Sequence, residues 1–228
     1  MAPSARPVRM APSILSADFA CLGNDIDRVR AETDWLHVDV MDGHFVPNLT
    51  IGPPVVRAIR RHTDDYLDCH LMMTNPGDYL EAFAQAGANS CTVHVEVGAT
   101  GELIARMRDL GLNAGLAVNP ETPISKCEPW LDRIDLLLVM SVHPGFGGQH
   151  FMEEAVPKIA RAAEIADRDD LDLTIEVDGG IDTTTVGRVA EAGARMFVAG
   201  NAIFGQDDPP AAAAAIRRAA EEAVAAHR

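Results

Sequence analysis

The sequence predicts an α/β fold, a single-domain (β/α)8 TIM barrel that spans residues 1–228. Eight apolar segments alternate with eight helix-like segments at roughly 28 residues per unit, and eight such units can close a parallel sheet into a barrel. No Gly-x-Gly-x-x-Gly motif follows the first apolar segment, which disfavours the rival fold, an open doubly wound sheet. Residues 1–7 are expected to form a loose N-terminal extension.

The predicted strands are short apolar runs, several of which show the two-residue alternation of a pleated strand. They cover residues 8–15, 35–41, 66–73, 90–96, 113–118, 134–141, 171–177 and 195–199. The predicted helices cover residues 18–30, 52–61, 75–87, 102–110, 152–166, 183–192 and 210–226, and a short helix is predicted within 120–130. Pro53 and Pro54 stand where a first helical turn tolerates proline, and Gly87 and Gly111 mark helix ends.

Composition and charge limit the classes of partner. Hydrophobic residues make up 47% of the chain and charged residues 23%, as in a globular protein. The formal net charge of −15 disfavours binding to nucleic acid and to anionic membranes. No apolar run approaches the ~18 residues of a membrane span and no signal-peptide core is visible, so a cytoplasmic protein is expected. The four cysteines form no Cys-x-x-Cys pair, which disfavours a zinc ribbon or a disulfide scaffold.

The most informative stretch is the predicted strand 35–41, which breaks into a glycine-bearing loop. Alternation places His37, Asp39 and Met41 on one face of this strand. Burying an imidazole and a carboxylate without partners is costly, and a divalent metal ion would supply a partner for both.

Two further strands complete a candidate metal site. His70 and Met72 share one face of the third predicted strand, and Asp178 follows the seventh. Together with His37 and Asp39, His70 and Asp178 form an N2O2 donor set that suits tetrahedral zinc and that manganese, iron or cobalt would also accept. Because the two aspartates come from well-separated strands, one could remove a proton from a substrate carbon while the other returns one from the opposite face. The metal would offset the charge of the enediolate formed between these steps.

Structural explanations compete with this interpretation. A lone inward-facing His or Asp in a barrel is more often a hydrogen-bonded structural residue than a ligand. His94 and Glu96 share a face of the fourth predicted strand and form a competing pair, interpreted here as supporting polar residues. Met41, Met72 and Met140 end three strands; methionine usually fills gaps in a core, but three at one rim indicate an apolar wall around a reactive intermediate.

Glycines follow three successive strands. They occur in Gly145-Phe146-Gly147-Gly148, Gly179-Gly180 and Gly200-Asn201. Main-chain N–H groups in glycine-rich turns converge on anions, and barrels often bind phosphate in the loops after strands seven and eight. Any one of these turns could be only a tight connection, but three neighbouring turns favour a phosphate-binding site.

Lysine is scarce, because only Lys126 and Lys158 occur and both lie in helix-like segments. A Schiff-base aldolase needs an amine at a strand end. The sequence therefore disfavours that class, and also the barrel decarboxylases that use a Lys–Asp array.

Over nearly its whole length the chain resembles one family, the ribulose-phosphate 3-epimerases of the pentose phosphate pathway. The resemblance rests on the motifs at 11–18 (APSILSAD), 37–48 (HVDVMDGHFVPN), 69–72 (CHLM), 113–123 (NAGLAVNPETP), 144–149 (PGFGGQ), 176–180 (EVDGG) and 198–204 (VAGNAIF). The long motif after residue 36 is highly specific, whereas the glycine turns alone would not be.

The resemblance implies that His37, Asp39, His70 and Asp178 bind one divalent metal ion per subunit, zinc first. Asp39 and Asp178 would be the acid/base pair that inverts carbon 3 between D-ribulose 5-phosphate and D-xylulose 5-phosphate. Ser13 and His70 would contact this small phosphorylated sugar, and the glycine turns would hold its phosphate. The strand-end positions of Met41, Met72 and Met140 predict that they contact it as well. The resemblance also implies a homo-oligomer, either a dimer or a larger closed assembly.

One departure from the family pattern is Asn201, where the family usually has serine; a main-chain amide survives that change. His143 is assigned no role. Two alternative functions stay open: a sister epimerase that acts on allulose 6-phosphate, and a non-catalytic barrel that binds sugar phosphates. The loop around Gly145 and Phe146 is hypothesised to close as a lid.

Overall fold

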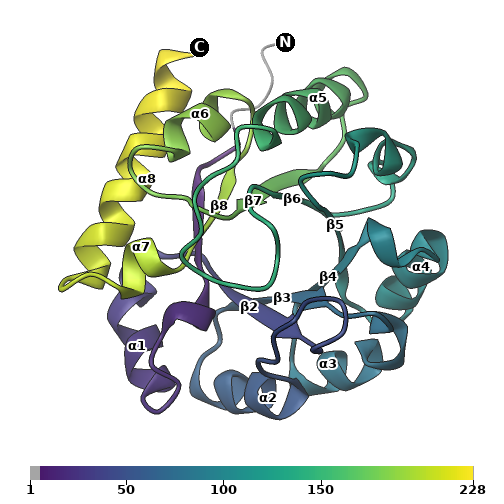
Figure 1. Ribbon diagram of the computed structural model, residues 1–228, viewed down its shortest axis with the longest axis horizontal. Helices are drawn as coiled ribbons and strands as arrows, with labels where there is room; N and C mark the ends of the chain where they lie inside the picture. Colours follow the sequence, from purple (N-terminus) through teal and green to yellow (C-terminus); the bar gives the residue numbers. More distant parts are fainter. Residues whose placement is uncertain (1–5, 228) are drawn as a thin grey trace.

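The computed structural model describes residues 6–227 and contains eight parallel strands in a ring, with helices around the outside (Figure 1). The strands are β1 (Arg9–Pro12), β2 (Trp35–Met41), β3 (Tyr66–Met72), β4 (Ser90–His94), β5 (Asn113–Val118), β6 (Leu136–Met140), β7 (Thr174–Asp178) and β8 (Met196–Ala199). Their order in the sheet is β1-β8-β7-β6-β5-β4-β3-β2, so each strand after β1 pairs with its neighbour in the chain.

Contacts between β1 and β2 close the ring. An isolated parallel bridge joins Ser13 to His37. Below it, the Asp34 N–H donates to the carbonyl oxygen of Met10 at 2.9 Å, and the Met10 N–H donates to the Asp34 carboxylate at 2.8 Å. The predicted (β/α)8 barrel is therefore confirmed, and the closure places Ser13 beside the informative strand.

The helices follow the predicted alternation, with local differences. They are α1 (Leu22–Val29), α2 (Pro53–His62), α3 (Leu80–Ala86), α4 (Thr100–Asp109), α5 (Ala155–Arg168), α6 (Val186–Glu191), α7 (Asn201–Phe204) and α8 (Pro209–Ala226). The prediction of a helix at 18–30 began too early, because residues 14–16 form a 3-10 turn and the helix starts at Leu22. In place of the short helix predicted within 120–130, two 3-10 turns form, because prolines remove N–H donors there. The short helix α7 was not expected.

Alternation along β2 separates an apolar layer from a polar one. Leu36, Val38 and Val40 belong to the large apolar core that the strands share with the helices. Their neighbours His37 and Asp39 are buried as well, although they are polar. The interior of the ring is thus where polar side chains are buried.

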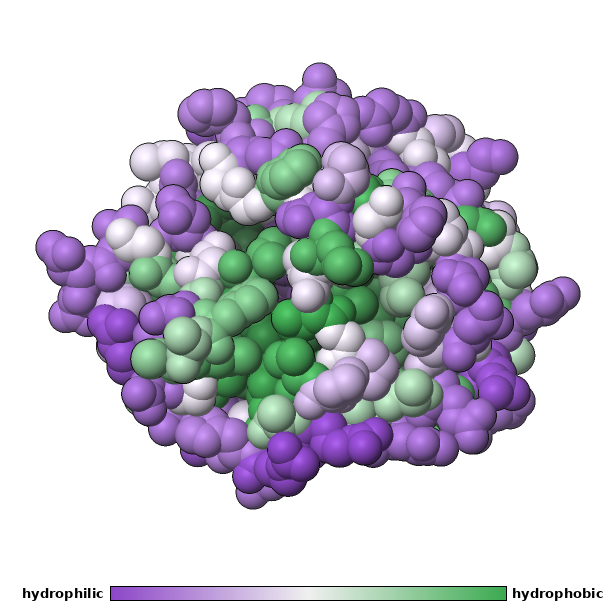
Figure 2. Space-filling model, turned by 60° about the horizontal axis from the view of Figure 1, so that its bottom comes forward, coloured by the Kyte–Doolittle hydropathy of each residue, from purple (hydrophilic) through white to green (hydrophobic). Residues whose placement is uncertain are grey.

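Large exposed hydrophobic side chains are few in residues 6–227, and each lies on a segment that follows a strand. They are Phe19 after β1, Leu49 after β2, Tyr79 after β3 and Phe146 after β6. Because parallel strands end at the same rim of a barrel, these side chains all belong to the loop-bearing end. Figure 2 shows a face of the molecule on which hydrophobic residues gather around a hollow, with hydrophilic residues around the edge.

Other expectations concern the membrane, the cysteines and the N-terminus. None of the helices in the described residues is both long and apolar enough to cross a bilayer. All four cysteines are free; Cys21 is exposed and the other three are buried. The guanidinium of Arg6 donates to the carbonyl oxygens of Leu171 and Leu173. Residues 1–5 of the expected loose extension lie outside the described part of the chain.

Candidate active site

Asp39 is the centre of a polar cluster at the C-terminal end of the barrel. The Ser13 hydroxyl donates to Asp39 Oδ2 at 2.6 Å. His70 Nδ1 lies 3.2 Å from Asp39 Oδ1, and His37 Nε2 lies 3.3 Å from the same oxygen. All four side chains are buried. Parallel pairing places Asp39 opposite His70 on β3, which explains why these groups meet.

Asp178 joins this cluster from β7. Ligand atoms of His37, Asp39, His70 and Asp178 all lie within 4.8 Å of one another. The end of β7 is held by Ser141, whose N–H and hydroxyl donate to the Asp178 carbonyl oxygen at 2.8 and 3.0 Å. The structure therefore brings together the four residues that the sequence analysis selected as metal ligands.

The chemistry of this cluster fits a divalent cation. Nδ1 of His37 forms a hydrogen bond with Asp68 Oδ2, at 2.8 Å. Nε2 of His37 is buried and has no hydrogen-bond partner among the described residues. A buried imidazole nitrogen without a hydrogen-bond partner, beside carboxylate oxygens and a second imidazole, matches the ligands of zinc and of manganese, iron or cobalt.

The two aspartates differ in proton affinity. Burial and the negative charge of Asp39 raise the pKa of Asp178 to about 7. Burial also acts upward on the pKa of Asp39, but His37 and His70 outweigh it and hold the pKa of this carboxyl well below its usual range. Near neutral pH the pair consists of an ionised carboxylate and a carboxyl that titrates, which is the arrangement expected of an acid and a base.

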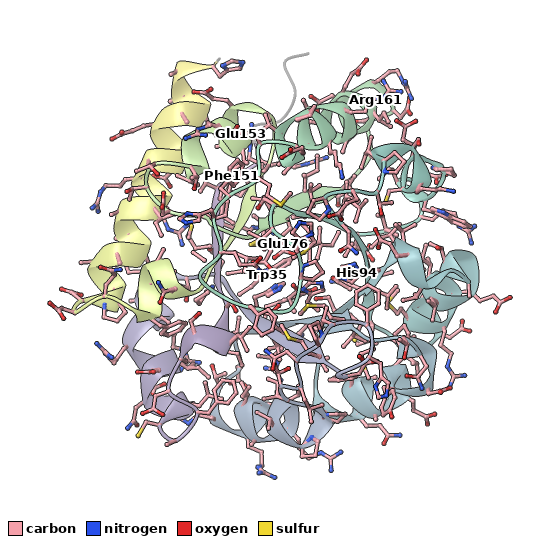
Figure 3. All side chains as sticks on the ribbon, in the orientation of Figure 1. Trp35, His94, Phe151, Glu153, Arg161 and Glu176 are labelled. Atoms are coloured by element: carbon pink, nitrogen blue, oxygen red, sulfur yellow. The ribbon has the colours of Figure 1, made fainter. Side chains whose placement is uncertain are left out.

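The sequence analysis missed two carboxyl groups below the cluster, Asp68 and Glu176. Asp68 accepts the hydrogen bond from His37 Nδ1. Glu176 Oε1 lies 3.5 Å from the same nitrogen, and Glu176 has no hydrogen-bond partner among the described residues. Figure 3 shows Glu176 inside the ring of strands. Each lies two residues before a predicted ligand, His70 or Asp178, so the same alternation could have identified both.

A cavity of about 760 Å³ opens at the cluster. Its lining includes Ser13, Asp39, Met41, Met72, Met140, Gly145, Phe146, Gly147, Gly148, Asp178, Gly179, Gly180, Gly200 and Asn201. Among the predicted site residues only His37 and His70 are absent from this lining, because both are fully buried beneath it. The structure therefore does not show His70 exposed to a bound substrate, and that predicted contact stays a prediction.

The turn after β7 requires glycine at two positions. Gly179 has φ 123°, and a Cβ there would lie 2.8 Å from the Val142 nitrogen. Gly180 has φ 62°, and a Cβ there would lie 2.5 Å from the Phe151 nitrogen. Figure 1 shows the segment between β6 and α5, which carries residues 145–148, passing over the end of the barrel. The lid hypothesis for this segment stays a prediction.

Arg188 of α6 also lines the cavity and was missed by the sequence analysis. Its guanidinium pairs with Glu153 and lies 5.9 Å from the centre of the Phe151 ring. No other Arg or Lys of residues 6–227 lines this cavity. Arg188 lies on the helix after β7, close in sequence to the Gly179-Gly180 turn, and this position could have identified it as a candidate.

Comparison with known proteins identifies the family. The model of the ribulose-phosphate 3-epimerase family matches residues 9–204. The chain belongs to this family. It is 47% identical over 212 residues to the cytoplasmic isoform of ribulose-phosphate 3-epimerase from Oryza sativa subsp. japonica, a match that covers 90% of this chain and 91% of the rice protein. The ribulose-phosphate 3-epimerase of Bacillus subtilis is 49% identical over 204 residues, covering 88% and 94% of the two chains.

Solved structures of other proteins share the fold of this family member. KGPDC from Streptococcus mutans superposes with a TM-score of 0.70 at 16% identity, covering 95% of this chain and 99% of that one. A 3-hexulose-6-phosphate synthase superposes with a TM-score of 0.65 at 18% identity, covering 92% and 99%. These likenesses support the barrel architecture alone.

Proposed function

We propose that this epimerase-family chain interconverts D-ribulose 5-phosphate and D-xylulose 5-phosphate at carbon 3, with one divalent metal ion bound by His37, Asp39, His70 and Asp178. Zinc is the first candidate, and manganese, iron or cobalt would also suit the ligands. The observation that carries the proposal is the convergence of these four groups at the base of a cavity. Their identity to the ligand set expected of the family supports it.

Asp39 and Asp178 are proposed as the acid/base pair. One carboxylate removes the proton from carbon 3 and leaves an enediolate, and the other carboxyl group returns a proton to the opposite face. The roles exchange when the reaction runs in reverse. The unlike pKa values of the two groups support this division of labour. A bound divalent ion would offset the negative charge on the enediolate oxygens.

The remaining predicted contacts fall into two groups. Ser13 holds Asp39 in place, and Met41, Met72 and Met140 are proposed to form an apolar wall that would exclude water from the enediolate. The turns at 145–148, 179–180 and 200–201 are proposed to hold the substrate phosphate through main-chain N–H groups. Arg188, which also lines the cavity, would add a positive charge.

Replacing either aspartate tests the acid/base assignment. We expect Asp178→Asn and Asp39→Asn to lower kcat by about 10²–10⁴-fold, the usual contribution of a general acid or base. Asp109→Asn, an exposed position at the end of α4, is the control and should leave the rate unchanged. Wild-type kcat in Asp178→Asn would contradict the two-aspartate mechanism, and retained sugar-phosphate binding with no turnover in the wild type would favour the non-catalytic alternative.

Solvent exchange tests the metal. In heavy water the xylulose 5-phosphate product should carry deuterium at carbon 3, and a strong chelator should abolish this until zinc or manganese is restored. Incorporation that survives exhaustive metal removal would show that the metal is dispensable. If the metal-loaded protein leaves pentulose phosphates unchanged but inverts allulose 6-phosphate, the sister epimerase activity is the correct one.

We also propose a cytoplasmic location and a homo-oligomeric state. The name of the rice relative, a cytoplasmic isoform, supports the first. The exposed side chains of Phe19, Leu49 and Tyr79 on the loops after three consecutive strands support self-association, since buried contacts would remove this apolar surface from water. Light scattering after size-exclusion chromatography measures the mass, and a mass of 24.4 kDa, that of one chain, would contradict it.

A further inference from the structure

A chain of hydrogen bonds runs away from His70 on the side opposite Asp39. His70 Nε2 lies 2.8 Å from His94 Nε2. On the far side of that ring, His94 Nδ1 lies 3.2 Å from Glu96 Oε2. His94, labelled in Figure 3, is 1% exposed and is not among the residues that line the cavity. The proposed reaction leaves His94 and Glu96 without a role.

The far end of this chain is firmly held. The Asn119 N–H donates to Glu96 Oε1 at 2.9 Å. The segment that carries Asn119 is fastened by Lys158, whose ammonium donates to the carbonyl oxygens of Asn119, Pro120 and Thr122 at 2.7, 2.7 and 2.6 Å. Burial acts upward on the pKa of Glu96, but hydrogen bonds from His94, Thr122 and Asn119 outweigh it and lower this pKa to about 2. Glu96 is therefore a charged acceptor in a defined position.

Counting protons shows that two neutral imidazoles leave this series of hydrogen bonds one proton short. Three contacts join Asp39, His70, His94 and Glu96, and each contact needs one proton between its two atoms. The two end groups are carboxylates, which only accept, and two neutral imidazoles bring one proton each. Two protons cannot serve three contacts. A cation on His70 Nδ1 removes the shortage, because His70 Nε2–H then donates to His94 and His94 Nδ1–H donates to Glu96.

We propose that His94 and Glu96 are positioning residues of the metal site: they fix the tautomer and orientation of His70 so that its Nδ1 lone pair faces the ion. This inference rests on the proposed metal dependence. It adds that every hydrogen bond from His70 through His94 to Glu96 is donated away from the metal ion. Histidines that bind metals generally donate their second ring N–H to a fixed acceptor, and removal of such acceptors typically costs 10–100-fold in metal affinity. Here the acceptor is a second imidazole, which a carboxylate orients in turn.

Metal affinity separates this role from a merely structural one. Zinc and cobalt affinities of the chelator-stripped full chain are measured by competition with a chromogenic chelator, together with the visible spectrum of the Co²⁺ form. We expect His94→Phe, which leaves His70 Nε2–H without an acceptor, to raise the metal Kd by about 10–100-fold and to change the Co²⁺ spectrum. Glu96→Gln should raise the Kd by about 10-fold. His94→Gln, whose amide oxygen can accept from His70, should recover part of the loss.

The chain offers a matched control in His143 and Glu121. Their Nδ1–Oε1 distance is 2.7 Å, both side chains are exposed, and neither residue lines the cavity. His143→Gln and Glu121→Gln should bind both ions as the wild type does. These control variants alter a His–Glu pair of the same kind as His94 and Glu96, but one that has no contact with His70.

The outcomes are distinct. Wild-type Kd and Co²⁺ spectrum in both His94→Phe and Glu96→Gln would overturn the positioning role while leaving the proposed metal dependence intact. If His94→Phe does not fold, Glu96→Gln decides alone, because Glu96 lies at the surface end of the chain with 20% of its side chain exposed. Failure of the wild-type chain to bind either ion would overturn both the metal dependence and this inference.

Discussion

The two histidines that flank Asp39 have opposite electrostatic surroundings. His37 points its second nitrogen down into the barrel, toward the carboxyl groups of Asp68 and Glu176. His70 points its second nitrogen sideways, toward the imidazole of His94. Both rings are fully buried and both contact the same oxygen of Asp39.

This difference sets the protonation of each ring. Burial lowers the pKa of His37, but the charge of Asp39, the hydrogen bond with Asp68 and the nearby carboxyl group of Glu176 outweigh it and raise this pKa well above 6.5. For His70, burial outweighs the hydrogen bond with Asp39, and the neighbouring His94 acts in the same direction, so the pKa falls to about 4. The carboxylate environment thus favours a proton on His37 in the metal-free protein, and by the same electrostatics we expect it to favour a divalent cation in place of that proton.

The largest effect is expected from Asp68→Asn, which removes the charged acceptor of His37. Breaking a buried charged pair generally costs about 3–5 kcal/mol, and the loss of a ligand-orienting carboxylate about 10–100-fold in metal affinity. Chemical denaturation and chelator competition measure the two effects. The control is Asp65→Asn on the same β-unit, whose surface pair with Arg30 should contribute about 0–1 kcal/mol. An Asp68→Asn protein as stable and as metal-avid as the control would show that His37 needs no charged acceptor.

The pH dependence of stability tests the buried carboxyl groups on the His37 side. Burial and the charge of Asp68 raise the pKa of Glu176 to about 8, and Asp178 titrates at about 7. The native state therefore holds more protons than the unfolded state between about pH 4 and 8, so the stability of the metal-free protein must fall as pH rises through this window. The raised pKa of His37 acts with the same sign. The lowered pKa of His70 opposes the two carboxyl groups between about pH 4 and 6.5 without outweighing both, and Asp39 affects stability only below about pH 4.

Glu176→Gln should flatten this slope. Without this carboxyl group, one proton fewer is lost as pH rises through about 8, and the metal-free variant should gain on the order of a few kcal/mol over the wild type at pH 9. Thermal melts of the chelated proteins from pH 5 to 9 measure the slopes. Glu102→Gln, an exchange of the same kind on the exposed side of α4, is the control. A wild-type slope in Glu176→Gln would mean that Glu176 is ionised throughout.

The smallest effect is expected from Ser90→Ala. The Ser90 hydroxyl donates to Asp68 Oδ1 at 2.6 Å. It therefore holds the carboxylate that in turn orients His37, without contacting His37 itself. Loss of this hydrogen bond should cost about 1–3 kcal/mol of unfolding free energy, with a weaker effect on metal affinity than Asp68→Asn. The control is Ser125→Ala, an exposed serine in a 3-10 turn. If Ser90→Ala loses as much metal affinity as Asp68→Asn, the orientation of His37 depends on the Ser90 hydroxyl rather than on the charge of Asp68.

Local patterns were enough for the strand faces and for most of the candidate site. A period of two puts His37, Asp39 and Met41 on one face whatever the strand pairs with, and the count of eight units predicts the barrel. The errors fall where local signals are weak. The interval 120–130 has the length of a helix, but its prolines prevent an α-helix. Helix α1 begins four residues later than predicted because residues 18–21 form a turn, in which the Cys21 N–H donates to the carbonyl oxygen of Asp18.

By itself, the sequence determined which residue types stand at strand ends and on which face, because alternation is a property of one strand and needs no partner. Tertiary structure alone decided which of them meet. Closure of the ring brought Asp178 of β7 within reach of Asp39 of β2, over a separation that no local pattern can measure. It also brought His94 into contact with His70, and Glu176 close to His37. Because the packed interior excludes water, each of these buried polar groups depends on its protein neighbours for partners.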